Sequence, residues 1–374
     1  MNPSAHALEL LLSSFAFVLG AVVGSFLNVC IHRLPRDLSV SEPRRSFCPA
    51  CKSPIPLHRN LPILSWLWLR GRCADCAARI PFRYLLVEVL TGLLFWALWQ
   101  KYHSGVWVLV LPAWVFASLL IAATFIDFEH CIIPDSITLG GAAAGLILSA
   151  AIPQMMDSDD HLASGLWSLL GAASGYGLVW AVVELGKLAL GRKRIAFEQP
   201  EPFRWTLHGD DADLQVAHIQ ERWSEIFARP SDRLIVEADT AEVEGQSFTS
   251  ARLIFEYEFL QIGSERWHLD KVPTITGTLR SLTIPREAMG FGDVKFAATI
   301  GAFLGWKAVL FTFIAACCTG ACIGLLTIAL GRREWSAKIP FGPYLAFAAL
   351  LWVFAGPELL EMLWRWRFGD SFPN

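Results

Sequence analysis

The chain has 374 residues, of which 54% are hydrophobic and 17% are charged, and it contains 16 tryptophans. This composition excludes an ordinary soluble domain, because long apolar stretches in such a chain are typical of transmembrane helices. The net charge of −3 says little by itself, but the basic residues are concentrated in a few segments. Length, composition and charge together favour a polytopic membrane protein.

Eight apolar runs follow one another along the chain, and each predicts a transmembrane helix. They cover roughly residues 8–29, 84–100, 106–126, 136–153, 164–190, 294–305, 307–330 and 340–356. The sixth run is too short to span a bilayer comfortably, so we expect it to tilt, to lie within protein or to start inside the membrane. The first run has no basic start and is too long for the apolar part of a cleaved signal peptide.

The basic residues indicate which helix ends face the cytoplasm. Segment 30–83 holds ten Lys and Arg and the run 192–194 is basic, whereas the acidic loop 157–160 has no Lys or Arg. The positive-inside rule therefore places the basic segments in the cytoplasm. Eight spans then put both termini outside, and they put Asp127 and Asp293 at cytoplasmic helix ends.

The first apolar run ends in small and polar residues. Gly24 and Ser25 permit close packing between helices in lipid. Asn28 lies at the membrane edge, where its side chain could bond a neighbouring helix or face the lipid headgroups, and the sequence does not separate these two interpretations.

Two C-x-x-C motifs follow, Cys48 with Cys51 and Cys73 with Cys76, separated by 21 residues. This spacing is typical of a tetrahedral zinc site with four thiolate ligands, which would be structural because no coordination position stays open. Cytoplasmic placement disfavours disulfides and strengthens the metal interpretation. A redox pair or unpaired thiols remain the alternative. The other cysteines are most simply packing residues in or beside membrane helices: Cys30, Cys131, Cys317, Cys318 and Cys322.

Asp127 ends the third apolar run and is a candidate site residue, since an ionisable group at membrane depth is costly and functional by default. Pro134 ends the helix, and Asp135 or the next residue can cap the following one. Asp135 therefore has a structural interpretation beside a functional one. Glu129 and His130 fit a solvated loop as well as they fit a site.

Residues 191–284 differ in character from the rest, with 27 charged residues in 94, and they predict an inserted soluble domain. Segment 211–229 has the apolar spacing of an amphipathic helix. Segments 233–237 and 252–260 are rich in β-branched and aromatic residues and predict strands. We expect a small α+β cytoplasmic domain, in which no metal spacing, phosphate loop or nucleophile motif is found.

The chain re-enters the membrane through Gly290-Phe291-Gly292-Asp293 and Lys295. Glycine allows close approach of backbone to backbone or to substrate, so two glycines flanking an acid at a helix start indicate a functional site. A second Pro/Gly cluster, residues 340–343, either shapes a groove beside the aspartates or is an ordinary helix start.

Two aspartates at one membrane face suit the chemistry of an aspartic protease. Two close carboxylates share a proton, so that one acts as base on a water while the other, protonated, polarises a carbonyl. The sequence separation of 166 residues from Asp127 to Asp293 is no obstacle if their helices pack together. Two acids at helix ends could equally serve a proton or ion pathway.

The motifs taken in order resemble those of the type IV prepilin peptidases, also called prepilin leader peptidase/N-methyltransferases, which are GxGD-type membrane aspartic peptidases. The resemblance covers nearly everything except residues 191–284. It rests on the two cysteine motifs and on these segments: Gly24 to Val29 with Arg33-Leu34-Pro35, Asn60-Leu61-Pro62, Leu69-Arg70-Gly71, Arg83-Tyr84 with Glu88, Asp127, Ile133-Pro134-Asp135, Gly290 to Lys295, and Pro340 to Pro343.

The resemblance implies that Asp127 and Asp293 are the catalytic pair. It implies removal of short basic leaders from type IV prepilins or type II secretion pseudopilins, at the cytoplasmic face of the bacterial inner membrane. Many members then methylate the new N-terminus with S-adenosylmethionine, but no methyl-donor motif is visible here, and a peptidase without that activity is the alternative. The residues expected around the pair are Gly290, Gly292, Lys295, Asp135 and Pro134.

We therefore expect an all-α polytopic membrane protein with about eight transmembrane helices, a small zinc-binding segment with four cysteine ligands, and an inserted α+β domain. The expected order is a first helix in 1–29, the zinc segment in 30–83, helices two to five in 84–190, the insert in 191–284, and the glycine motif with helices six to eight in 285–374. No nucleic-acid partner is expected. The insert could gate the site or contact pilus or secretion assembly machinery, or be a tolerated insertion.

Two other functions fit parts of the sequence. A transporter would use the two acids to bind protons or cations, and it predicts further polar residues along the helices. A membrane scaffold would use the zinc segment and the insert, and it predicts that substituting either aspartate is silent.

Overall fold

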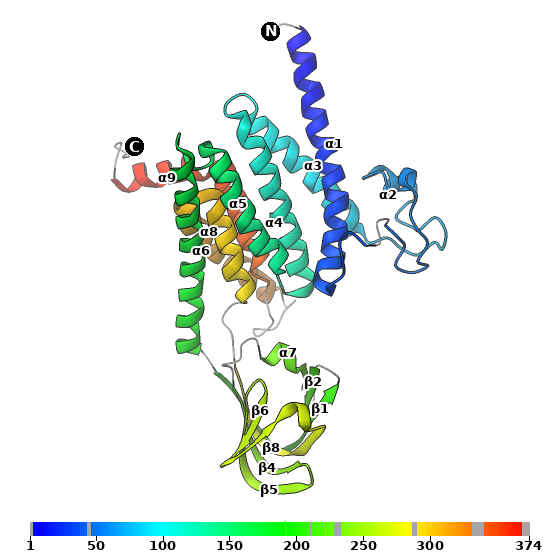
Figure 1. The fold of residues 1–374 in the computed structure, drawn as a ribbon, viewed down its shortest axis with the longest axis vertical. Helices are drawn as coiled ribbons and strands as arrows, with labels where there is room; N and C mark the ends of the chain where they lie inside the picture. Colours follow the sequence, from blue (N-terminus) through cyan, green and yellow to red (C-terminus); the bar gives the residue numbers. More distant parts are fainter. Residues whose placement is uncertain are drawn as a thin grey trace. The chain divides into compact units, whose positions relative to one another are not determined.

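The computed structural model describes residues 3–42, 46–190, 192–208, 211–217, 219–227, 233–285, 290–330 and 340–368. The chain forms two compact units, one from Met1–Trp180 with Met289–Asn374 and the other from Ala181–Ala288. In Figure 1 the long helices α4, α5 and α6 of the first unit run roughly side by side.

The first unit is built from helices. Within the described residues, five stretches are long and apolar enough to cross a membrane, and α5 and the first part of α9 are apolar but shorter. Many of their large apolar side chains face outward, as expected of helices surrounded by lipid. The helices are α1 (Pro3–Arg33), α2 (Leu64–Trp68), α3 (Phe82–Tyr102), α4 (Val110–His130), α5 (Asp135–Ala151), α6 (His161–Leu190), α8 (Phe291–Ala329) and α9 (Gly342–Phe368).

Helix α8 joins the two apolar runs that were predicted on either side of residue 306, and it is broken at Gly305. This glycine has φ +77° and ψ 175°, a conformation that residues with a side chain resist. The start of α8 lies near the first turn of α9. Beyond the break, Phe311 packs on Trp352 and Gly320 lies beside Tyr344. Later residues of α8 therefore contact earlier residues of α9. The chain therefore reverses at Gly305.

The first half of α8 packs tightly on α6 through glycines. A Cβ atom added to Gly175 would lie 2.2 Å from the carbonyl oxygen of Ala297, and one added to Gly171 would lie 2.2 Å from that of Gly301. The Ser168 hydroxyl donates a hydrogen bond to the carbonyl of Ala302 at 2.7 Å. Small residues at i and i+4 let two helix backbones approach in this way, which is a common packing device in membranes.

The second unit is a sheet of eight strands, all paired antiparallel, in the order β3-β2-β1-β8-β4-β5-β6-β7. Its apolar core includes the fully buried Trp205 and Phe255, and Trp223 of the short helix α7 packs edge-on against both rings. The strands are β1 (Arg192–His208), β2 (Asp211–Val216), β3 (Ile219–Arg222), β4 (Leu234–Val243), β5 (Gln246–Phe255), β6 (Phe259–Ile262), β7 (Glu265–His268) and β8 (Thr274–Pro285), with α7 at Trp223–Ile226.

The prediction of one helix over 211–229 is wrong for the residues of this segment that the structure describes. The segment forms β2, β3 and the four-residue helix α7, while residues 228–229 lie outside the described residues. Ala212, Leu214 and Val216 are buried in alternation, and β2 pairs with β1, so cross-strand packing prevails over a helical spacing that was only partial. The segments predicted as strands do form strands, but the second is divided into β5 and β6. The insert is therefore a β-sheet domain with one short helix.

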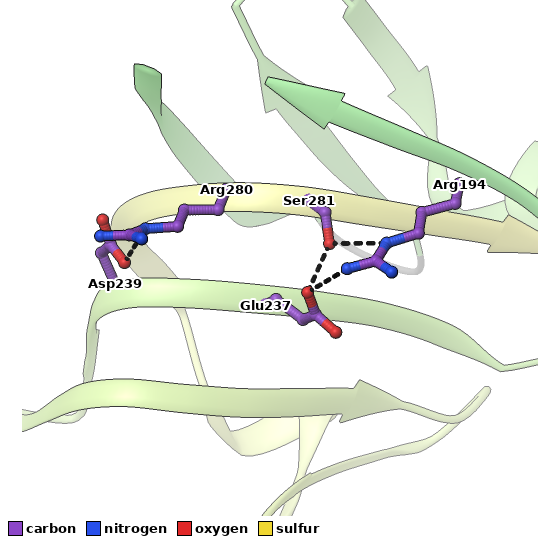
Figure 2. A network of polar contacts seen from close by, with 5 residues as sticks. All are labelled: Arg194, Glu237, Asp239, Arg280 and Ser281. Atoms are coloured by element: carbon purple, nitrogen blue, oxygen red, sulfur yellow. Dashed lines mark hydrogen bonds and ion pairs between the residues drawn. The ribbon is translucent and has the colours of Figure 1, made fainter. Parts of the chain in front are cut away.

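Polar side chains tie three neighbouring strands of this sheet together (Figure 2). Glu237 of β4 accepts hydrogen bonds from Ser281 of β8 at 2.8 Å and from Arg194 of β1 at 2.7 Å. The bond from Ser281, together with the Arg194 charge, holds the pKa of Glu237 below its usual value. Arg280 and Asp239 form a second β8–β4 pair at 2.6 Å. These contacts favour one pairing register between β8 and its neighbours β1 and β4.

The α6–α8 contact predicts that Gly175→Ala destabilises the helical unit. The added methyl group would overlap the Ala297 carbonyl, and overpacking of this kind costs about 1–3 kcal/mol. Thermal unfolding of the purified protein in detergent measures the effect.

The matched control is Gly177→Ala, two residues along the same helix, where an added Cβ meets nothing within 4 Å. It should leave the melting temperature unchanged or raise it slightly, since Ala favours helix over Gly. Equal destabilisation by both variants would contradict the packing argument.

Candidate active site

Asp127 is buried near the end of α4, with 4% of its surface exposed. Its Oδ2 accepts a hydrogen bond of 2.8 Å from the backbone N–H of Gly342, the first residue of α9. A Cβ atom at position 342 would lie 2.7 Å from the same oxygen, so only glycine fits without displacement. The second Pro/Gly cluster therefore contacts the carboxylate directly, which the sequence indicated only as one of two alternatives.

Asp293 lies in the first turn of α8, with 7% of its surface exposed. Its backbone N–H donates to the carbonyl of Gly290, which is the N-cap residue of α8. Its Oδ1 is buried and has no hydrogen-bond partner among the described residues. The Asp293 carboxylate lies within electrostatic range of Asp127. The structure thus brings together the two acids that the sequence singled out.

Ile133, in the loop between α4 and α5, fills the space beside both glycine motifs. A Cβ atom at Gly292 would lie 3.3 Å from the Ile133 backbone nitrogen, and one at Gly342 would lie 3.0 Å from the end of the Ile133 side chain. Ile133 is 6% exposed. The two glycines therefore let the starts of α8 and α9 close on this loop, which keeps the carboxylates at one end of the bundle. In the sequence Ile133 belongs to one of the motifs, but nothing there predicts this role for it.

Lys295 and Asp135 form an ion pair of 2.6 Å between α8 and α5. The ammonium group of Lys295 also lies 5.1 Å from the centre of the Phe291 ring. The prediction that Asp135 caps α5 is wrong: Pro134 is the N-cap residue and no side-chain cap bond forms. Asp135 instead lies in the first helical turn, where a carboxylate is favoured by the helix dipole. Its side chain is 61% exposed, unlike the buried pair.

Glu129, two residues after Asp127, forms an ion pair with Arg83 at the start of α3. Arg83 also lies over the ring of Tyr84, 5.2 Å from its centre. The side chain of Asn28 donates to the carbonyl of Tyr84 at 3.0 Å, so it bonds a neighbouring helix. The ends of α1, α3 and α4 are thereby connected by polar contacts whose partners are too distant in sequence to be paired by inspection.

The four cysteines of the two C-x-x-C motifs converge. Their sulfur atoms all lie within 4.8 Å of one another, and Cys48 Sγ and Cys76 Sγ are 3.8 Å apart. Four thiolates around a tetrahedral Zn²⁺ at about 2.3 Å would be separated by about 3.8 Å. The arrangement of Cys48, Cys51, Cys73 and Cys76 therefore fits a closed zinc site.

The protonation of these thiols also suits a metal. Hydrogen bonds from Ser53 lower the pKa of Cys51 to about 6, so this thiol is ionised at neutral pH. A backbone hydrogen bond from Ala78 favours ionisation of Cys76, but the neighbouring Cys51, with burial and the other thiols, outweighs it and raises the pKa of Cys76 to about 12. The four thiols cannot all ionise side by side without a cation, and a divalent metal supplies that charge.

Two protein-family profiles match the chain. That of the Bacterial Peptidase A24 N-terminal domain covers residues 18–102, which include the four cysteines. That of the Type IV leader peptidase family covers residues 114–193 and 253–325, which include both aspartates, and the gap between them lies in the insert.

Several curated proteins are similar to the chain. A prepilin leader peptidase/N-methyltransferase of Aeromonas hydrophila is 30% identical over 93% of each chain, an alignment that extends across the insert. The protein of the same name in Myxococcus xanthus is 46% identical over 44% of this chain and 46% of its own length. A type 4 prepilin-like proteins leader peptide-processing enzyme of Escherichia coli is 38% identical over 47% of this chain and 70% of its own.

No solved structure matches the chain. The profile matches and the near full-length similarity to the Aeromonas protein agree with each other and with the arrangement of the motifs in space. The chain belongs to the type IV leader peptidase family.

Proposed function

We propose that Asp127 and Asp293 are the catalytic pair of this leader peptidase, and that it cleaves without a nucleophilic side chain or a catalytic metal. The observation that carries the proposal is the position of two buried carboxylates from distant segments at one end of the bundle, each beside a glycine-containing helix start. Membership of a peptidase family supports it.

The two carboxylates divide the chemistry between them. Neighbouring carboxylates in a water-poor site hold one proton between them. The ionised acid takes a proton from a water molecule, which attacks the scissile carbonyl carbon, while the protonated acid donates a hydrogen bond to the carbonyl oxygen. When the tetrahedral intermediate collapses, a proton passes to the leaving amine and the C–N bond breaks. The Gly342 N–H, bonded to Asp127 Oδ2, fixes the orientation of that carboxylate.

Gly290, Gly292 and Pro134 position the pair in this proposal. Gly290 and Gly292 hold the turn that presents Asp293, and Pro134 ends the loop that passes between the two helix starts. The Lys295–Asp135 ion pair fastens α8 to α5 two residues beyond Asp293. Asp135 is thus a positioning residue.

The substrates are proposed to be type IV prepilins or type II secretion pseudopilins, cut after a short basic leader. Relatives named prepilin leader peptidase and leader peptide-processing enzyme support this class of substrate. The basic residues of segment 30–83 support a cytoplasmic active site in the bacterial inner membrane. With α8 counted as two spans that reverse at Gly305, eight helices would cross the bilayer.

Methylation of the new N-terminus by S-adenosylmethionine is the second proposed activity, supported by the N-methyltransferase part of the relatives' names. The sheet domain is proposed to contact pilus or secretion assembly machinery. Zn²⁺, held by the four cysteines, would be structural, because four protein ligands leave no position for a water or substrate.

The dyad predicts that Asp127→Asn and Asp293→Asn each lower the rate of leader removal by on the order of 10³-fold, since each removes one half of an acid–base pair. Cleavage of a prepilin from the same genome by purified protein in detergent, followed by mass spectrometry, measures the rates.

The control for these variants is Asp157→Asn, in the loop before α6, which should cleave at the wild-type rate. Cleavage at full rate by either Asn variant would show that the assigned pair is wrong, and Asp135 would be the next candidate. If wild-type protein cuts no pilin-like substrate, transport and scaffold functions gain support.

The contact at Gly342 predicts that Gly342→Ala lowers the cleavage rate at least tenfold, because the methyl group would displace the Asp127 carboxylate. Gly320→Ala is a matched control on the α8–α9 interface, where the nearest atom would lie at an ordinary 3.5 Å. Similar losses in both variants, or a lower melting temperature for Gly342→Ala alone, would point to general damage instead.

The cysteine cluster predicts that Cys48→Ser abolishes bound zinc and lowers the amount of folded protein before it lowers turnover per molecule, because structural zinc contributes folding free energy. Metal analysis and the yield of monodisperse protein measure both effects. Cys318→Ser, outside the cluster, should change neither. Normal yield of wild-type protein with no zinc would refute the structural role.

A further inference from the structure

The short helix α2, in the middle of the zinc segment, presents an exposed apolar face. Leu64, Leu67 and Trp68 occupy positions i, i+3 and i+4, which lie on one side of a helix, and Trp68 is 83% exposed. Leu61, just before the helix, is also exposed. These four residues form the α2 face. Contiguous apolar surface of this kind usually marks a site of contact with a partner or a membrane.

The opposite side of α2 is fastened to the start of α3. The indole N–H of Trp66 donates to the carbonyl of Ile80 at 3.4 Å, and its ring packs edge-on against Phe82 with 5.8 Å between the ring centres. The backbone N–H of Ile63, the residue before α2, donates to the Glu88 carboxylate at 2.7 Å. The position of α2 relative to the bilayer is therefore determined by that of α3.

The length of α3 places these contacts at the edge of the hydrocarbon layer. Its 21 residues rise about 31 Å, which matches a hydrocarbon core of about 30 Å. Phe82, its first residue, then lies at the boundary between hydrocarbon and headgroups. Glu88 is six residues, or about 9 Å, farther in, and its side chain leans back toward the start of the helix. Ile63 therefore lies at or inside the boundary.

Helix α1 gives the same depth independently. A Cβ atom added to Gly24 would lie 2.8 Å from the Cα of Glu88, so these two residues are level with each other. The Asn28 side chain bonds the Tyr84 carbonyl, which agrees with this antiparallel register of α1 and α3. Gly24 lies nine residues before the end of α1, about 13 Å along the helix. The carboxylate that holds Ile63 is thus level with the apolar part of both helices.

The surroundings of the α2 face also suit a membrane. Phe82, which contacts Trp66, and Phe26 of α1 are both exposed, so the α2 face continues the lipid-facing surface of the two long helices. Arg70 and Arg72, directly after α2, are exposed as well. Tryptophan favours the headgroup level of a bilayer, and arginines beside it attract anionic headgroups.

We propose that α2 is an interfacial helix: the α2 face lies against lipid acyl chains, and Arg70 and Arg72 bind anionic headgroups. Interfacial helices bury their apolar faces about 5–10 Å into the boundary, which agrees with the depth of Ile63. The zinc segment is then seated partly in the membrane surface, whereas its basic residues alone predict a segment wholly in the cytoplasm. The proposal goes beyond leader cleavage and does not depend on the aspartate pair.

The test replaces Trp68 with a genetically encoded fluorescent amino acid in full-length, zinc-loaded protein in lipid nanodiscs. Lipids that carry a nitroxide near the top of the acyl chain should quench this probe at least threefold more than lipids that carry it at the chain end. Iodide, which stays in water, should quench it weakly. The control probe replaces Ser41, an exposed residue of the same segment whose neighbours bond Arg33 at the end of α1. There iodide should quench more than either lipid.

Two sets of variants test the face and the arginines separately. Leu64→Gln combined with Leu67→Gln should lower lipid quenching at position 68 at least twofold, because the polar side chains withdraw the face from the acyl chains. Leu38→Gln is the matched control, an exposed leucine of the same segment outside the α2 face, and it should change nothing. Zinc content checks that each variant is folded.

For the arginines, nitroxide on phosphatidylglycerol should quench the probe at position 68 more than nitroxide on phosphatidylcholine does. Arg70→Gln combined with Arg72→Gln should remove this difference. Equal quenching by both lipids in the protein with unchanged arginines would overturn their role in headgroup binding.

Two other results would overturn the interfacial helix. Strong quenching by iodide with none by lipid would place the α2 face in water. Shielding from both quenchers would show that protein covers the face, whether the sheet domain, a second copy of the chain or a substrate. Asp127→Asn should give the unaltered quenching profile, so a failure of the lipid proposal and a failure of the peptidase proposal are distinguishable.

Discussion

A carboxylate buried among apolar helices costs free energy unless hydrogen bonds are donated to it. Asp127 receives its bond from the backbone of Gly342, and this contact determines much of the surrounding structure. It requires glycine at the start of α9, and it requires the α4–α5 loop to pass within van der Waals distance of that glycine. The glycine motif that contains Asp293 lies close to the same loop, at Ile133. Two helix starts and one helix end are thus held together around the acids.

The zinc segment needs a source of stability other than a large apolar core. Between α1 and α3 the described residues form only short helices and two isolated β-bridges, and a segment of about 50 residues cannot build a large apolar core. The four cysteines join its two halves, and the buried Arg33 donates to the carbonyls of Ser39, Val40 and Glu42 at its start. One metal and one arginine would thereby hold the segment in place beside the membrane helices.

Much of this arrangement could be predicted from the sequence, because it depends on strong local signals. Apolar length indicated the membrane helices, the spacing of cysteines indicated the metal site, and the glycines beside Asp293 indicated a site at a helix start. The sequence could not provide partners that depend on tertiary packing. The Gly342 contact and the Arg83–Glu129 pair join segments far apart in the chain. In the insert, the apolar spacing of segment 211–229 suits a helix, but residues 211–216 and 219–222 form β2 and β3, which pair with β1 and with each other. Local periodicity does not identify the partner strand in contacts of this kind.

The break at Gly305 has a consequence for how the protein is made. Residues 291–304 rise only about 21 Å as a helix, less than the hydrocarbon core of about 30 Å. Such a segment is too short to be stable in lipid as an independent span when it leaves the ribosome. Its longer continuation, residues 306–329, must enter with it as a hairpin, and α6 must already be present to receive its glycine face. The Asp293 end of the site is therefore assembled only after synthesis has passed the reversal, late in the maturation of the chain.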